Sequence, residues 1–199
     1  MATPTNTYDK AESGLKSYAK KAPLTITSAL TGDSISFAAF LNSFSQNFTS
    51  NWSSEEVYGR NDPISTFQGT KRSISISFEI PSNSLESAKS ALSGCNKLAK
   101  FLYPGYLDSS QASGKIISRP PLVKIKFANL ISNGADGPLL GFLDGLEWNP
   151  LLEMGMFHEG ASSFKLYPKV ISLAFTFNVL HQKDIGWGEN NKWDGKLIG

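Results

Sequence analysis

Hydrophobic and polar residues alternate along several stretches of the chain and predict strands that are buried on one side. The clearest stretch is "RSISISFEI" at residues 72–80, where Ile74, Ile76 and Phe78 alternate with serines. The stretch "KVISLAFTFNVLH" at 169–181 alternates in the same way from Ile171 to Val179. Because side chains of a strand point to opposite faces in turn, each stretch predicts a strand with one face on a core and one face open.

The hydrophobic period changes to three and four residues after Pro81. Leu85, Ala88, Leu92, Cys95 and Leu98 follow this spacing. Asn83 or Ser84 is a suitable N-cap, and Pro104 with Gly105 ends the pattern. The spacing predicts one amphipathic helix over about residues 84–102, packed on a sheet.

Shorter runs complete the expected sheet. Residues 24–52 contain three strand-like runs, the last with Phe44, Phe48 and Trp52 on one side. "LVKIKFANLI" and "LLGFLDGLEWNP" predict a hairpin around the glycine-containing turn at 132–138. In its second strand we expect Phe142, Leu146 and Trp148 on one side and Leu143 on the other. Residues 105–121 have no sustained period and predict a surface loop.

The chain divides into an N-terminal arm at 1–23, one β domain at 24–182 and a C-terminal arm at 183–199. Residues 8–21 have the spacing of a short basic amphipathic helix. The C-terminal arm is polar and glycine-rich but carries Trp187 and Trp193. Because exposed tryptophans are costly, we expect them to dock on a neighbouring subunit or to fold back on their own subunit.

Composition narrows the function classes. The 199 residues have a formal net charge of only +2, which gives no general electrostatic grip on nucleic acid. Cys95 is the single cysteine, which excludes an intrachain disulfide framework and a multi-cysteine metal site. The N-terminal sequence lacks the apolar core of a signal peptide, and no segment approaches the length of a membrane span. We therefore expect a protein assembled in the cytoplasm, without membrane contact.

No residue pattern predicts catalysis. His158 and His181 are not at metal-motif spacing, and no serine lies in a nucleophile motif. Carboxylates such as Glu79, Asp144, Glu147 and Glu153 are available, but their spacing does not select a catalytic pair. We expect no catalytic, cofactor-binding or metal-binding residues, and predict a structural or binding protein that is not an enzyme.

The segment before the clearest strand, residues 55–72, mixes charges of both signs with aromatic residues. It can be interpreted as a chemical site, as a phosphate grip or as a joint between subunits. Acidic residues beside the basic ones oppose a phosphate grip, whereas mixed charges with aromatics are typical of specific interfaces. The joint is therefore favoured. Together with the two arm tryptophans, the predicted interface residues are Glu55, Glu56, Tyr58, Arg60, Asp62, Phe67, Lys71, Arg72, Trp187 and Trp193.

The order of these features carries a resemblance to a known family. The chain first has an aromatic strand that ends in Trp52 and then the segment "GRNDP" (Gly59, Arg60, Asn61, Asp62 and Pro63). An alternating strand, one helix ending in "YP", a glycine-turn hairpin and a long closing strand follow in this order. Over about residues 25–182, this order resembles the tail-tube fold of contractile-tailed bacteriophages. It is most similar to the baseplate-proximal members that cap or initiate the tube.

The resemblance implies a fold and an assembly. The fold would be a mainly β, two-sheet sandwich or barrel with one flanking helix, and the assembly a homo-oligomeric ring, expected to be a hexamer, in the virion tail. Other tube proteins, the baseplate hub or the sheath would be its partners. DNA or the tape-measure protein would pass through the lumen without specific binding. The connector between Trp52 and Ile74 would reach a neighbouring subunit or ring. Such lumens are usually acidic, and the slightly basic composition leaves the sign of this lumen open.

Two alternatives remain at the level of sequence. A monomeric β-sandwich could bind a carbohydrate or another small ligand on its exposed tryptophans. A baseplate-associated cell-wall hydrolase is the third class, for which the sequence offers no catalytic constellation.

Overall fold

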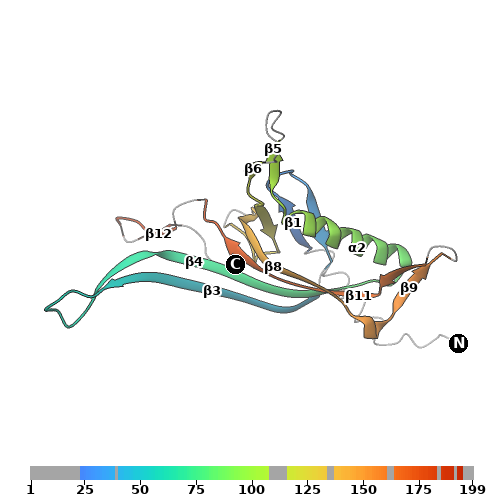
Figure 1. The fold of residues 1–199 in the computed structure, drawn as a ribbon, viewed down its shortest axis with the longest axis horizontal. Coiled ribbons are helices and arrows are strands. Elements are labelled where there is room, and N and C mark those ends of the chain that lie inside the picture. The colour runs from blue at the N-terminus through green and yellow to red at the C-terminus, as the bar shows by residue number, and fades with distance from the viewer. Residues whose placement is uncertain are drawn as a thin grey trace.

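A computed structural model describes residues 23–38, 40–107, 116–133, 137–160, 164–182, 185–190 and 192–194. The expected N-terminal helix at 8–21 lies outside the described residues. Seven strands form one antiparallel sheet in the order β2-β1-β7-β8-β11-β4-β3 (Figure 1). These strands are β1 Leu24–Ser28, β2 Ser34–Phe37, β3 Phe40–Glu55, β4 Ile64–Pro81, β7 Val123–Lys126, β8 Leu139–Pro150 and β11 Val170–Val179.

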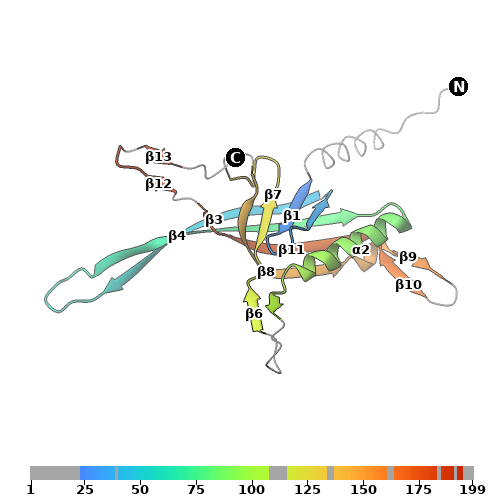
Figure 2. The same ribbon diagram turned by 90° about the horizontal axis from the view of Figure 1, so that it is seen from above.

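The remaining elements are the helix α2, Leu85–Lys100, a short 3-10 helix and three small antiparallel ribbons. In Figure 2, α2 lies across one side of the sheet. The small elements are β5 Gly105–Leu107 with β6 Ile116–Arg119, η1 Leu152–Met154, β9 Met156–Glu159 with β10 Lys165–Pro168, and β12 Gly186–Trp187 with β13 Trp193–Asp194. The first ribbon corrects the loop expected at 105–121, since both of its strands are too short to show a hydrophobic period.

The two alternating stretches are the neighbouring strands β4 and β11. Their register pairs Phe78 with Leu173 and Ile76 with Phe175, and all four side chains are buried. Burying each such side chain stabilises the fold by roughly 1.5–3 kcal/mol before the entropy cost. The predicted strands and their buried faces are confirmed.

The helix begins and ends close to its predicted limits. The side chain of Ser84 caps it by accepting a hydrogen bond from the backbone amide of Ser87 at 3.2 Å. Its buried face includes Cys95 and Leu98. At Gly94, a Cβ would lie 2.9 Å from the Phe37 ring, so this glycine lets the helix approach β2 closely.

The sheet folds over its own core. The ring of Phe37 in β2 lies 5.9 Å from that of Phe78 in β4, although β1, β7, β8 and β11 separate the two strands in the sheet. The mainly β fold with one flanking helix is confirmed. In place of two separate sheets, the structure has one continuous sheet of seven strands. Its two halves correspond to the two predicted layers and are joined through β8 and β11.

A β-bulge in β8 corrects one prediction. Gly145 has a φ of 63°, and the register with β11 shifts by one residue at this point. Because one extra residue reverses the alternation, Leu143 before the bulge and Trp148 after it share the core side, while Phe142 lies on the other side. The expectation that Phe142 and Trp148 share a face was wrong.

Candidate functional site: the projecting β3–β4 hairpin

The longest hairpin of the protein extends well beyond the sheet. β11 pairs with β4 only over residues 73–81, whereas β3 and β4 remain paired as far as Glu55 and Ile64. Residues 48–72, which we call the distal hairpin, therefore form a two-stranded ribbon with its tip at 56–63 (Figure 1). Eight residues of strand span about 25 Å. The connector expected between Trp52 and Ile74 is thus a β-hairpin whose second strand already starts at Ile64.

One face of the distal hairpin is aromatic. Trp52 pairs with Phe67 across the strands, and their rings meet edge to face at a centroid distance of 5.2 Å. The two side chains are 60% and 53% exposed. Phe48 lies on the same side of β3, because it precedes Trp52 by four residues, an even number, along the strand. The opposite face, which includes Thr49 paired with Lys71, is polar.

Arg72 lies where the distal hairpin joins the sheet. Its side chain is only 2% exposed. Its Nε and Nη2 donate hydrogen bonds to Oε1 of Gln46 at 3.2 and 2.8 Å, and its guanidinium lies 5.5 Å from the centre of the Phe48 ring. Burial lowers the pKa of Arg72. Within the described residues, no carboxylate is in ion-pair distance of it. Arg72 is thus buried within its own subunit, whereas the sequence predicted it to be an interface residue.

The tip is built as an exposed turn. Gly59 has a φ of 86°, and the amide of Arg60 donates to the carbonyl of Val57 at 3.2 Å. Tyr58 is fully exposed. The other predicted tip residues, Glu55, Glu56, Arg60 and Asp62, are also exposed, and the described part of the chain provides none of them with an ion pair. The structure therefore brings seven predicted interface residues onto one accessible hairpin: Glu55, Glu56, Tyr58, Arg60, Asp62, Phe67 and Lys71.

The two arm tryptophans form a separate surface. Trp187 and Trp193 pair across the β12–β13 ribbon, with ring centroids 5.3 Å apart at an angle of 73°. Both side chains are exposed. They therefore contact each other and still present apolar area to solvent.

The face of the sheet away from α2 carries three carboxylates on its central strands, with Phe142 of β8 and Lys124 of the neighbouring β7 on the same side. The position of this face relative to α2 can be followed in Figure 1. Glu79 of β4 lies opposite Ser172 of β11, and Asp144 and Glu147 of β8 project to the same side. Over β8, β11 and residues 73–81 of β4, this open face carries these three carboxylates and no basic side chain. The local charge is therefore negative, in contrast to the net charge of the whole chain. The alternation could predict such a face, but the bulge at Gly145 hid that the three carboxylates share it.

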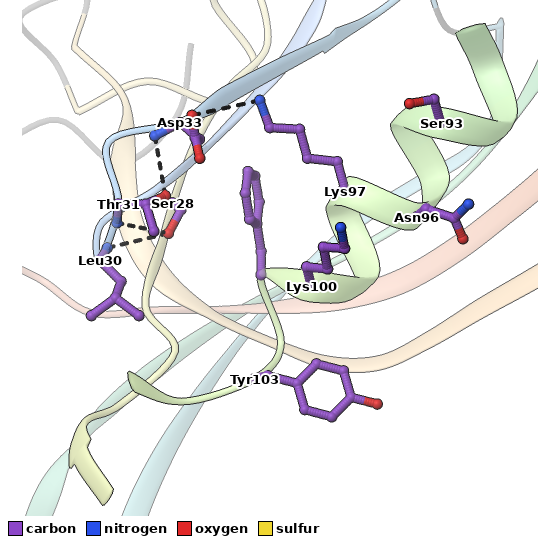
Figure 3. Close-up of a pocket in the computed structure, with 10 residues that line it drawn as sticks. Ser28, Leu30, Thr31, Asp33, Ser93, Asn96, Lys97, Lys100 and Tyr103 are labelled. Carbon is purple, nitrogen blue, oxygen red and sulfur yellow. Dashed lines mark hydrogen bonds and ion pairs between the residues drawn. The ribbon is translucent and has the colours of Figure 1, made fainter. Parts of the chain in front are cut away.

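A hollow of about 510 Å³ lies between the β1–β2 turn and the last turns of α2 (Figure 3). Lys97 Nζ lies 3.7 Å from Oδ1 of Asp33 at its rim, and Ser28 Oγ accepts the amide of Leu30 at 3.2 Å. Neither histidine and no cysteine lines it. The ion pair joins the helix to the turn, and the hydrogen bond lies within the turn. None of the contacts among the described lining residues pairs a hydroxyl nucleophile with a side-chain base. The residues that line the hollow are distant in the sequence and meet only in the folded chain, so no sequence pattern predicts the hollow.

The cysteine and the two histidines, the other candidate chemical groups, do not form a common site among the described residues. Cys95 is buried, which raises its pKa to about 11 and leaves the thiol unreactive. His158 of β9 stacks on Phe164, which precedes β10, and His181 follows β11. Among the described residues, no group of three or more His, Cys, Asp or Glu side chains could hold a metal ion. No helix in the described ranges is long and apolar enough to cross a membrane.

Comparison with known proteins assigns no family to the chain. The sequence matches no protein-family model. A search of curated proteins gives no significant match either.

Proposed function

We propose that this protein is a structural, non-enzymatic subunit of the tail of a tailed bacteriophage, forming a ring in the tail tube or at the baseplate. The observation that carries the proposal is the distal hairpin, a two-stranded ribbon with an exposed aromatic face. Isolated two-stranded hairpins are marginally stable in water, so an ordered one of this length requires a partner surface. A second copy of the chain in a ring or stack provides that surface.

The edges of the sheet support self-assembly. The long strand β3 and the short strand β2 are the two edges. An unpaired edge presents backbone amides and carbonyls that another strand can bind, and a closed ring removes such edges. Pairing between β3 of one subunit and β2 of the next would extend the sheet around a ring.

The open face supports a role in lining a lumen. Its serines, threonines and carboxylates, including Glu79, Asp144 and Glu147, make the surface of these central strands mainly polar and negative, with Phe142 exposed beside them. Carboxylates repel the phosphates of DNA, so DNA would slide past this face without binding. The proposed lumen is therefore acidic despite the net charge of +2.

A matched pair of proteins tests the proposal. In the shortened variant, Asn-Gly replaces residues 50–70, and a two-residue turn then closes the hairpin on the paired residues Thr49 and Lys71. The wild-type protein is expected to form rings or stacks in electron microscopy and concentration-dependent oligomers in light scattering. The shortened variant is expected to stay monomeric while it keeps the thermal unfolding transition of the sheet. Unchanged ring formation by the shortened variant, or a wild-type protein that is monomeric at all concentrations, would contradict the proposal.

A further inference from the structure

The edge strand β2 leaves one backbone edge open. Within the described part of the chain, β2 pairs with β1 alone. The amide of Ser28 donates to the carbonyl of Asp33 at 2.8 Å, and hydrogen-bonded pairs alternate along an antiparallel register. Ser34 and Ser36 therefore direct their amides and carbonyls away from β1. On this outer side, Nζ of Lys97 donates to the carbonyl of Ser34 at 3.4 Å, which leaves the amide and carbonyl of Ser36 for another strand.

A groove of about 550 Å³ lies along this open edge, between β2 and α2. β2 contributes the buried side chains Ile35 and Phe37 to its lining. Apart from Lys97, the lining residues of α2 are all small: Ser87, Ser90, Ala91, Ser93 and Gly94. No carboxylate is among the described lining residues, so the groove is nearly uncharged. An open strand edge beside a helix with small side chains is a geometry in which an extended peptide adds as a further strand.

The N-terminal arm contains a segment with matching chemistry. Residues 3–7, "TPTNT", alternate threonines with Pro4 and Asn6 and carry no charge. Threonine favours strands, and amides of successive strand residues point to opposite edges. Pro4 has no amide and therefore suits the outer edge, which leaves the amides of the threonines to face β2. A proline on the outer edge also opposes the pairing of yet another strand.

The arm leaves the sheet beside the groove. Leu24, the first residue of β1, pairs with Phe37, which lines the groove. Residues 8–22 would span roughly 22 Å even as a helix, whereas the four residues of β2 span about 13 Å. A short tether of this kind raises the effective concentration of a segment to the millimolar range, which a second copy in dilute solution does not reach. The arm of the same chain is therefore the favoured occupant of the groove.

We propose that residues 3–7 of the chain's own N-terminal arm add to the edge of β2 in the unassembled subunit and cover it. An uncovered edge invites uncontrolled pairing. In the ring of the proposed function, the same edge receives β3 of a neighbouring subunit, so the arm must leave before the ring closes. The docking of the arm is argued from the groove, the open edge and the arm sequence alone. Its role in delaying assembly rests on the proposed function.

Intrachain disulfide trapping in the dilute full-length protein tests the docking. Thr5→Cys or Asn6→Cys is combined with Ser90→Cys near pH 8, where the buried Cys95, with a pKa of about 11, stays unreactive. The matched control replaces Ser90→Cys by Asn96→Cys, which is exposed on α2 but does not line the groove. Because neighbouring residues of a strand face opposite sides, only one of the two arm cysteines is expected to face α2.

We expect that arm cysteine to form the disulfide with position 90 at least tenfold faster than the other arm cysteine does. It should also react at least tenfold faster with position 90 than with position 96. Equal rates for all four combinations would overturn the docking, whether or not the wild-type protein forms rings.

A pair of proline substitutions tests the role of the arm in assembly. Thr5→Pro removes an amide that faces β2, whereas the matched control Asn6→Pro removes one that faces solvent. We expect Thr5→Pro to lower the concentration needed for half-maximal assembly at least threefold and Asn6→Pro to leave it nearly unchanged. Equal effects of the two substitutions would overturn the role of the arm alone. A wild-type protein that stays monomeric while position 90 still traps one arm cysteine would overturn the proposed function and support the docking.

Discussion

The two halves of β4 differ in what covers them, although both continue the same strand. Residues 73–79 lie between β11 and β3, and their alternating side chains Ile74, Ile76 and Phe78 fill the core. Residues 64–72 pair with β3 alone, and there the large side chain Phe67 is half exposed. The inner half is thus stabilised by its own subunit. The outer half has the same strand geometry but lacks a covering layer within the described part of the chain, and this difference is why we propose that a second subunit covers it.

Phenylalanine truncation should give the largest difference between the two halves. Phe78→Ala removes a fully buried ring and is expected to lower the free energy of unfolding by about 3–5 kcal/mol. Phe67→Ala removes a half-exposed ring that contacts Trp52 and is expected to cost about 1 kcal/mol or less. Urea denaturation of the dilute monomer measures both. Similar losses would show that the distal hairpin belongs to the core of the subunit.

The junction between the halves depends on how the buried Arg72 is satisfied. Gln46→Met removes the acceptor of two guanidinium hydrogen bonds and is expected to cost about 1–3 kcal/mol of unfolding free energy. Replacing both partners, Gln46→Met with Arg72→Met, is expected to recover most of that loss, because no buried charge then remains unpaired. Denaturant titration of the wild type, both single variants and the double variant measures the coupling. Strictly additive losses would contradict a specific Gln46–Arg72 interaction.

The smallest effect is expected from pH. Burial and the nearby Arg72 guanidinium lower the pKa of His181 below its ordinary value of about 6.5. The folded state therefore favours the neutral imidazole, and this contribution to stability is present above pH 6.5 and is lost as the pH falls through the folded pKa. His181→Gln should flatten the pH dependence of the unfolding midpoint between pH 7 and pH 5. Unchanged pH dependence in that variant would show that protonation of His181 does not change the stability of the fold.

Much of the inner sheet could be predicted from the sequence, because burial there repeats every second residue. The strand centred on Phe78, the strand centred on Phe175 and the capped helix from Leu85 all follow from that period or from the helical one. The bulge at Gly145 could not be predicted in this way, because an extra residue breaks the period that the prediction uses.

The distal hairpin was predicted only in part. Its charges and aromatics indicated an interface, but residues 64–72 lack a regular apolar alternation, so their strand was missed. The signal available was the β-favouring residues at 64, 66, 67 and 70 opposite the aromatic run ending in Trp52. The burial of Arg72 depends on its pairing with Phe48 in β3. The spacing of residues along the chain does not predict which residues of two strands pair, so this burial could not be predicted.

Hydrogen exchange tests most directly whether the outer half of the β3–β4 hairpin is an assembly element. In dilute monomer, we expect backbone amides of residues 48–55 and 64–71 to exchange quickly, while those of 73–80 stay protected by β11 and β3. On assembly at high concentration, the outer amides are expected to slow at least about 100-fold and the inner ones to change little. Outer amides that are as protected as the inner ones in the monomer, or that remain fast in assembled rings, would contradict the account.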